Sequence, residues 1–246
     1  MLQKTAATSD AANIKPHIAI EAQNVTLSLG EGDARVDILG GINLSIDSGT
    51  TVALLGPSGS GKSSLMAILS GLERATGGTV NIAGADFGTM NEDELAIARR
   101  GRVGIVLQAF HLLPTMSALE NVAVPLELDG QADPFGIAAK ELEAVGLGDR
   151  LGHYPTQLSG GEQQRVAIAR AMASRPSIIF ADEPTGNLDG ATGEIIIELL
   201  FERQKASNAT LLMITHDPEL AKRCDRIIEL RDGMIEKDSA QKPAKS

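Results

Sequence analysis

Apolar and polar residues alternate along the first quarter of the chain, in a pattern typical of half-buried strands. The alternation is clear at residues 18–20 and 42–46, and we expect β-structure from 18 to 46. The next run, residues 51–55, is almost entirely apolar, as in strands that are buried on both faces.

Beyond this run, short apolar segments alternate with longer stretches of good helix formers. We expect helices at 63–72, 162–173 and 191–205, and strands at 103–107, 178–181 and 210–214. This alternation predicts an α/β fold with a mostly parallel, twisted sheet. Helix formers also dominate residues 89–160, where Asn91-x-x-Glu94 resembles a capping box, so we expect an inserted helical subdomain there.

The length of 246 residues suits a single domain with a subdomain, which we place at 18–237. Polar composition predicts a disordered leader at 1–17 and a disordered tail at 238–246. The apolar runs are strand-sized, far below the roughly 20 residues of a membrane-spanning helix.

Charge and aromatic content narrow the range of partners. The formal net charge is −10, and only 2% of residues are aromatic, with no Trp. Nucleic-acid binding needs clustered basic residues or aromatic stacking platforms, so we expect no nucleic-acid partner. The single cysteine, Cys224, excludes an internal disulfide.

A glycine-rich motif follows the apolar run at 51–55. Residues 56–63 match the phosphate-loop pattern G-x-x-x-x-G-K-[ST] between a predicted strand and a predicted helix. Glycines let successive backbone N–H groups face one anion, Lys62 adds positive charge, and Ser63 can ligate Mg²⁺. A plain Gly-Ser turn is the alternative, but chance gives this pattern only about once in a hundred chains of this length. The predicted nucleotide-binding residues are Gly56, Pro57, Ser58, Gly59, Ser60, Gly61, Lys62, Ser63 and Ser64.

Two adjacent carboxylates, Asp182 and Glu183, follow the apolar strand at 178–181. Ligands of open α/β sheets bind at the carboxyl ends of strands. We expect Asp182 to hold Mg²⁺ and Glu183 to polarise an attacking water as a general base. The alternative is a solvated acidic turn before Pro184.

A third motif, Leu-Ser-Gly-Gly at residues 158–161, opens a predicted helix. Its N–H groups and the positive end of the helix can bind a phosphate. Taken alone, the motif favours a simple helix N-cap.

These three motifs, together with Gly-Asn-Leu-Asp at 186–189, resemble those of the ATP-binding-cassette ATPases, and the likeness covers residues 18–237. The resemblance implies a P-loop (RecA-like) core with an antiparallel β subdomain and a helical subdomain that carries the Leu-Ser-Gly-Gly signature. It also implies ATP and Mg²⁺ as cofactors and a second copy of the chain as partner. In such a head-to-tail pair Ser159, Gly160 and Gly161 close over the partner's ATP, and Asp189 communicates across the dimer.

The same resemblance gives roles to two residues that follow predicted strands. Gln108 is implied to lie near Mg²⁺ and the attacking water, and His216 to contact the γ-phosphate as a switch. The fold should gather Gly56, Gln108, Asp182 and His216 on one rim of the sheet. Where family members usually stack an aromatic residue on adenine, this chain has Leu29, which predicts modest ATP affinity and poor discrimination against GTP.

Residues 110–122, 158–165 and 180–189 resemble one branch of the family, the lipoprotein-release, macrolide-export and FtsE-type ATPases, and most of all the YbbA-type members. The branch implies a separate MacB/FtsX-like permease, driven by mechanical transmission from the cytoplasmic face of the plasma membrane. We place the coupling surface after Gln108. Its apolar candidates, which could equally pack the helical subdomain, are Phe110, Leu112, Leu113 and Met116.

Three alternative assignments share part or all of this pattern of motifs. A soluble family member serving a cytosolic partner, such as an iron–sulfur assembly complex, would share every motif and stays open. A chromosome or repair ATPase needs a long coiled coil between Lys62 and Ser159, where only about a hundred residues are available. A phosphate-loop kinase or GTPase has no use for the motif at 158–161.

Overall fold

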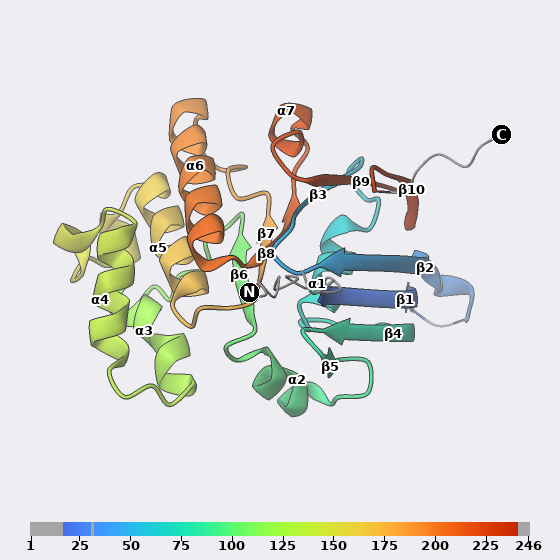
Figure 1. The fold of residues 1–246 in the computed structure, drawn as a ribbon, viewed down its shortest axis with the longest axis horizontal. Helices are drawn as coiled ribbons and strands as arrows, with labels where there is room; N and C mark the ends of the chain where they lie inside the picture. The colour runs from blue at the N-terminus through green and yellow to red at the C-terminus, as the bar shows by residue number, and fades with distance from the viewer. Residues whose placement is uncertain (1–16, 31, 241–246) are drawn as a thin grey trace, which may run out of the picture.

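The computed structural model describes residues 17–30 and 32–240, whose strands form two sheets (Figure 1). The six-stranded sheet has the order β10-β9-β3-β8-β7-β6, and its strands are β3 (Thr51–Leu55), β6 (Val103–Leu107), β7 (Ile178–Asp182), β8 (Thr210–Ile214), β9 (Arg226–Arg231) and β10 (Met234–Asp238). The four-stranded sheet has the order β2-β1-β4-β5, and its strands are β1 (Ile18–Leu29), β2 (Val36–Asp47), β4 (Gly77–Ile82) and β5 (Ala85–Asp86).

Pairing within the six-stranded sheet is parallel except between β9 and β10. The register places Leu107 beside Asp182, and Asp182 beside Ile214. The carboxyl ends of β6, β7, β8 and β3 therefore lie at one rim. The expected mostly parallel α/β core is confirmed.

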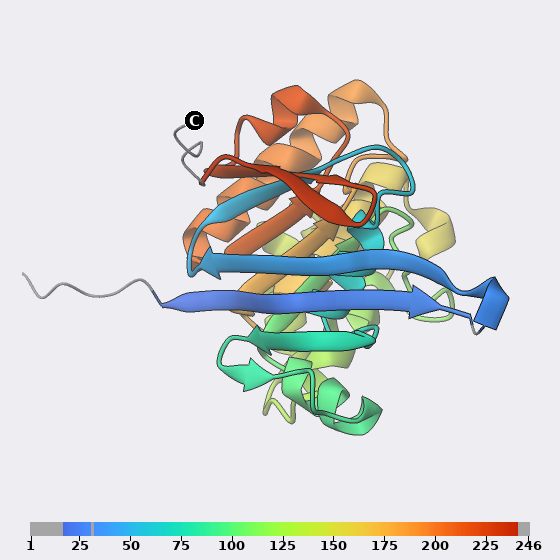
Figure 2. The same cartoon turned by 90° about the vertical axis from the view of Figure 1, so that its right-hand side faces the viewer.

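The second sheet is antiparallel throughout and is built on two long strands. Figure 2 shows β1 and β2 side by side, with their joining 3₁₀ turn, η1 (Gly32–Ala34), projecting beyond the rest of the fold. This sheet is the expected antiparallel β subdomain.

Helix α1 (Lys62–Leu69) packs between the two sheets. Its buried Leu65, Met66 and Leu69 share one apolar cluster with Phe180 of β7 and with residues of β1, β2 and β4. Neighbouring residues of a strand point to opposite faces, so Ile179 packs instead into a second cluster with α5 (Gly160–Met172) and α6 (Gly190–Ser207). This placement holds α1, which begins within the phosphate loop, between two rigid layers.

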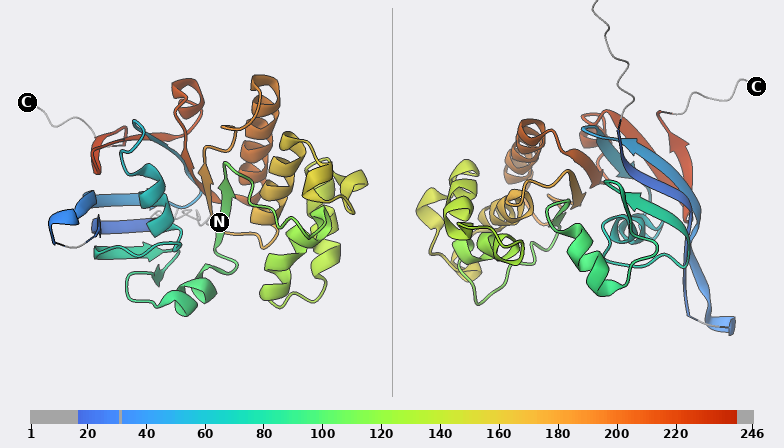
Figure 3. Two further views of the ribbon diagram at one scale, coloured as in Figure 1. Left: turned by 180° about the vertical axis from the view of Figure 1, so that it is seen from behind. Right: turned by 60° about the horizontal axis from the view of Figure 1, so that its bottom comes forward.

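A third cluster joins α3 (Ala118–Leu128), α4 (Pro134–Ala144) and the outer face of α5. Figure 3 shows these helices on the opposite side of the molecule from β1, β2 and β4. The range expected for the helical subdomain, 89–160, differs from this unit in two respects. Strand β6 belongs to the core sheet, and α2 (Glu92–Arg99) buries Leu95 and Ala98 in the first cluster.

Some element boundaries also differ from expectation. Helix α1 ends at Leu69, because Ser70 caps it and Gly71 adopts a φ of 72° close to the Phe87 ring. Asp238, the first residue of the expected disordered tail, instead closes β10 and forms an ion pair with Arg226 at 2.6 Å. The expected leader lies outside the described residues, apart from residue 17, as does the tail from 241.

Within the described residues, no helix is both long enough and apolar enough to span a membrane. A short helix, α7 (Pro218–Ala221), follows β8 and leads toward β9.

Candidate nucleotide site

The phosphate loop is a tight turn between β3 and α1. Gly56 has a φ of 150°, and a Cβ there would lie 2.1 Å from the carbonyl oxygen of Leu230. Gly61 has a φ of 95°, and a Cβ there would lie 2.8 Å from Leu39. Both positions therefore require glycine, because any side chain would force the loop away from β9 or β2.

Lys62, at the start of α1, points its ammonium group back into this loop. Its Nζ donates to the carbonyl oxygens of Gly56 and Pro57, both at 2.8 Å. Lys62 is buried, yet no carboxylate lies within ion-pair distance of it among the described residues. The charge is thus available to an anion that enters the loop.

A pocket of about 520 Å³ opens over the loop. Most of the predicted phosphate-loop residues line it, together with Glu183 and His216 at the far wall. Its lining residues are Ile38, Gly56, Ser58, Gly59, Gly61, Lys62, Ser63, Ser64, Glu183, Ile214 and His216. The lining combines the polar phosphate-loop residues with apolar Ile38 and Ile214, a combination that suits a phosphorylated ligand with a flat base.

Two predicted loop residues, Pro57 and Ser60, do not line the pocket. The Pro57 carbonyl is occupied by Lys62, and Ser60 is buried with no hydrogen-bond partner for its hydroxyl. A Cβ on Gly56 would come within 2.8 Å of that hydroxyl, so the Ser60 side chain fills the space that Gly56 leaves open. Their roles are to shape the loop.

Asp182 ends β7 next to the loop. The pKa of the Asp182 carboxyl is raised, above all by burial and also by the neighbouring Glu183. The Ser63 hydroxyl and Lys62 act in the opposite direction but do not reverse the shift. No group of three or more His, Cys, Asp or Glu residues gathers into a metal cage within the described part of the chain. Mg²⁺ is usually held by one or two protein oxygens, water and substrate phosphates, so Asp182 and Ser63 fit that ion.

Glu183 and His216 face each other across the end of the pocket. The Glu183 Oε1 lies 3.5 Å from His216 Nδ1, and the side chains are 28% and 74% exposed. Glu183 has a φ of 42°, an unfavourable value for a residue with a side chain, and its N–H donates to the carbonyl of Ile214 at 3.1 Å. The backbone therefore fixes the carboxylate over the pocket, where it can accept a proton.

Gln108 reaches the same rim but does not line the pocket. Its Nε2 donates to the Asn187 side chain at 3.4 Å, and the Asn187 Nδ2 donates to the Gln108 carbonyl at 2.9 Å. A Cβ on Gly186 would lie 2.5 Å from the Gln108 amide nitrogen. Gln108 is thus packed against residues 186 and 187, beyond Asp182.

The signature residues also lie outside the pocket. Ser159 caps α5 in a capping box: its Oγ accepts from Glu162 N at 3.3 Å, while Glu162 accepts from Ser159 N at 2.8 Å. Gly160 packs beside Leu188, and a Cβ on Gly161 would lie 2.5 Å from Thr192. None of Ser159, Gly160 and Gly161 is among the residues that line the pocket.

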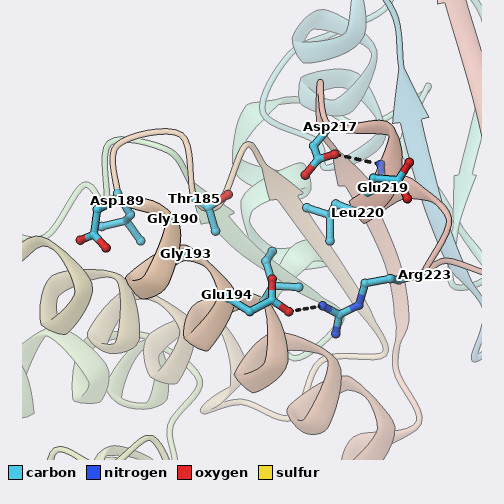
Figure 4. A pocket seen from close by; sticks show the side chains of 11 residues that line it. Thr185, Asp189, Gly190, Gly193, Glu194, Asp217, Glu219, Leu220 and Arg223 are labelled. Carbon is cyan, nitrogen blue, oxygen red and sulfur yellow. Dashed lines mark hydrogen bonds and ion pairs between the residues drawn. The ribbon is translucent and has the colours of Figure 1, made fainter.

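Asp189 caps α6 and borders a second pocket of about 310 Å³ between α6 and α7 (Figure 4). Its carboxylate accepts from the Thr192 N–H at 3.0 Å and from the Thr192 hydroxyl at 2.8 Å, which lowers the pKa of Asp189. Arg223 and Glu194 both line this pocket, and the Arg223 Nη1 donates to the Glu194 Oε1 at 2.8 Å. Asp189 is therefore held at the start of a helix that is clamped to the segment after His216.

Sequence reasoning missed Ile38 as a wall of the nucleotide pocket. Leu29, the residue expected at the adenine position, is 54% exposed and does not line the pocket. Ile38 belongs to none of the sequence motifs. It reaches the phosphate loop only because it lies on β2, where its carbonyl oxygen is close to Gly61. No sequence signal would have identified it.

Comparison with known proteins decides the family. A family model described as ABC transporter matches residues 39–186, which is more than half of the chain. The chain belongs to the ABC transporter family. This ABC ATPase is 47% identical over 222 residues to the ABC transporter ATP-binding protein YbbA of Escherichia coli K12, covering 89% of this chain and 97% of YbbA.

This ABC ATPase is also 44% identical over 219 residues to the macrolide export ATP-binding/permease protein MacB of Bdellovibrio bacteriovorus, covering 89% of the chain but 34% of MacB. Its fold matches a dimeric structure of the ATP-binding cassette MJ0796 in a post-hydrolysis state with ADP and Pi. The TM-score is 0.83 at 39% identity, over 89% of this chain and 97% of that one. The expected fold class, family and ATPase activity are confirmed.

Proposed function

We propose that this ATPase works as a head-to-tail dimer, in which the signature of one copy closes over the ATP held by the phosphate loop of the other. The observation that carries the proposal is the separation of the two elements within one chain. The 520 Å³ pocket is lined by the loop and not by Ser159, Gly160 or Gly161. The cassette MJ0796, 39% identical, has been solved as a dimer with ADP and Pi.

In this dimer Lys62 and the loop amides bind the terminal phosphates, and Ser63 and Asp182 would hold Mg²⁺. The ion would neutralise charge that develops on the phosphates during hydrolysis. Glu183 accepts a proton from the attacking water, while His216 and Gln108 sense the terminal phosphate. Asp189 of each copy lies at the seam between them.

We further propose a MacB/FtsX-like permease as the membrane partner, which would place the ATPase at the cytoplasmic face of the plasma membrane and transmit its movement mechanically. The chain matches about a third of the length of MacB, whose name describes both an ATP-binding protein and a permease. A soluble assembly partner remains the second candidate, because it would use the same ATP site.

An apolar groove of about 450 Å³ beside β6, the edge strand, supports a membrane partner. Arginines line it in a chain whose net charge is −10: Arg99, Arg100 and Arg170. Its apolar lining is contributed by Leu72, Val103, Ile105, Val124, Pro125 and Leu128. An amphipathic cytoplasmic helix of the permease with a carboxylate among its apolar residues would suit this groove.

The test uses the Glu183→Gln variant, which keeps the pocket but lacks the base. The immobilised variant, loaded with ATP and Mg²⁺, is incubated with detergent-solubilised membranes, and retained proteins are identified by mass spectrometry. Retention of an integral-membrane permease supports the transporter function. Retention of soluble proteins alone favours the second candidate, and a Lys62→Ala control, unable to hold ATP, should retain neither.

Leu113 offers a test of the coupling surface after Gln108. It is 42% exposed, whereas Leu112 packs against the helical cluster. Leu113→Asp should abolish permease retention and leave basal hydrolysis unchanged. A loss of folding, measured by circular dichroism, would instead assign Leu113 to the packing of the subdomain.

A further inference from the structure

Arg170 joins the signature helix to the segment that follows Gln108. It lies on α5, and its guanidinium donates to two consecutive backbone carbonyls, from Nη1 to His111 at 2.8 Å and from Nη2 to Phe110 at 2.9 Å. The side chain is half-buried, and desolvation lowers its pKa. One planar fork thus holds two neighbouring peptide groups.

The backbone that it holds is unusual. Phe110 has a φ of 58° and His111 a φ of 47°, so two consecutive residues with side chains adopt the left-handed conformation. Such residues are rare outside glycine because the Cβ crowds the backbone, and they persist only where surrounding contacts enforce them. Arg170 supplies one such contact, beside the backbone hydrogen bonds from the Phe110 N–H to the Leu107 carbonyl at 3.2 Å and from the His111 N–H to the Ala109 carbonyl at 2.6 Å.

The same segment touches α5 at its other end. A Cβ on Gly160 would lie 3.8 Å from the tip of the Phe110 ring, so this ring lies beside the start of the helix. Residues 110 and 111 are therefore attached to α5 at its first turn, through the ring, and near its C-terminal end, through Arg170. Arg170 also lines the apolar groove beside β6.

We propose that Arg170 is a positioning residue for ATP hydrolysis: it locks the left-handed Phe110–His111 segment onto α5, so that the segment that follows Gln108 and the signature serine Ser159 keep a fixed relative position. Force applied at the groove would then reach both elements together. The effect on hydrolysis rests on the dimer proposed above, whereas the rigidity of the segment is a property of the single chain.

Arg170→Met removes both donors while keeping a long side chain. In the single chain we expect amide hydrogen exchange to rise about tenfold at residues 109–113 and also at the start of α5, as expected when charged hydrogen bonds are lost. In ATPase assays kcat should fall about tenfold while KM for ATP changes less than about twofold, because the phosphate loop is untouched.

Arg165→Met is the matched control. Arg165 lies on the same helix, is also half-buried, and donates from Nη1 to the carbonyls of Val145 at 3.2 Å and Gly146 at 3.4 Å. We expect faster exchange near Gly146 alone and unchanged kcat. Equal effects of the two variants on kcat would reduce Arg170 to a general structural role.

Glycine at 111 tests the mechanism directly, because glycine adopts a positive φ without strain. In the Arg170→Met background, His111→Gly should recover part of the lost kcat; no recovery would overturn the backbone argument. If Arg170→Met does not fold, Arg170→Lys, which can reach one carbonyl, should give an intermediate loss. Faster exchange confined to residues 110 and 111, with the start of α5 unchanged, would show that the two elements do not move together.

Discussion

The phosphate loop and the signature are the two phosphate-seeking elements of this chain, and each keeps its functional group in a local bond. Lys62 donates to two carbonyls of its own loop, and Ser159 shares a capping box with Glu162. They differ in surroundings. The loop belongs to a pocket with walls from β2, from β8 and from Glu183 after β7, whereas Ser159, Gly160 and Gly161 do not line that pocket.

One chain therefore contains two parts. The receiving half is the phosphate loop with the walls of its pocket, and the closing half is the signature at the start of α5. The receiving half is rigid, because α1 is held between two sheets. The closing half is carried by α5, which packs with one face on the core sheet and with the other on α3 and α4. Hydrolysis would therefore require two chains, and each could regulate the other.

The largest effect should come from breaking the two halves separately. Lys62→Ala and Ser159→Arg should each reduce ATP hydrolysis by about a thousandfold, because each removes one half of both composite sites. Mixed in equal amounts, they should recover about one quarter of the parent activity, since half of randomly paired dimers carry one intact site. A mixture as inactive as its components would contradict head-to-tail pairing.

A comparison of two serine variants, with a smaller expected effect, distinguishes the helix-capping role of Ser159 from its role in ATP hydrolysis. Ser117 and Glu120 form a capping box on α3 with nearly the same geometry, with N–H to carboxylate at 2.7 Å and hydroxyl to carboxylate at 2.8 Å. Ser159→Ala and Ser117→Ala should each cost about 1 kcal/mol of unfolding free energy. Only Ser159→Ala should also lower kcat, by about tenfold to a hundredfold.

Equal activity in these two serine variants would leave Ser159 with a capping role alone. Chemical denaturation and steady-state ATPase assays on the same preparations measure both quantities.

The receiving half predicts a change of a few degrees in thermal stability. Because its pKa is raised in the folded chain, Asp182 binds its proton more tightly there, and its contribution to stability falls as pH rises from 3.8 through the folded pKa. At pH 7 without ligand, Asp182→Asn should raise Tm by about 2–4 °C. The gain should vanish toward pH 3, and stabilisation by ATP with Mg²⁺ should be weaker than in the parent.

The smallest effect concerns the base. Leu29 is exposed and outside the pocket, so an aromatic residue there could close over adenine. Leu29→Tyr should lower KM for ATP by about fivefold, within the range for stacking on one base. The parent should show little preference for ATP over GTP, and a strong preference would mean that Ile38 or another wall already reads the base.

Much of the fold followed from local pattern. The apolar strand at 178–181 and the glycine-rich turn after Leu55 specify their own conformations, and the parallel order of the sheet brings their ends together. The hairpin of β9 and β10 was missed, although Asp232-Gly233 between two alternating segments is a turn signal.

Other features depend on residues that are distant in sequence. Gln108 turns toward Asn187 because Gly186 leaves room for it, and Arg170 reaches Phe110 and His111 only once α5 lies beside them. Neither contact has a local sequence pattern. For the same reason, the helix expected to reach residue 72 ends where Gly71 meets the Phe87 ring.

The turn between β9 and β10 has a consequence for synthesis on the ribosome. Gly233 donates from its N–H to the Ser60 carbonyl at 3.1 Å and accepts at its own carbonyl from the Gly40 N–H at 3.0 Å. A residue translated late thus fastens a loop translated early to β2. During translation the phosphate loop stays without this support until Gly233 has emerged, and we expect a nascent chain to reach full affinity for ATP only after that point.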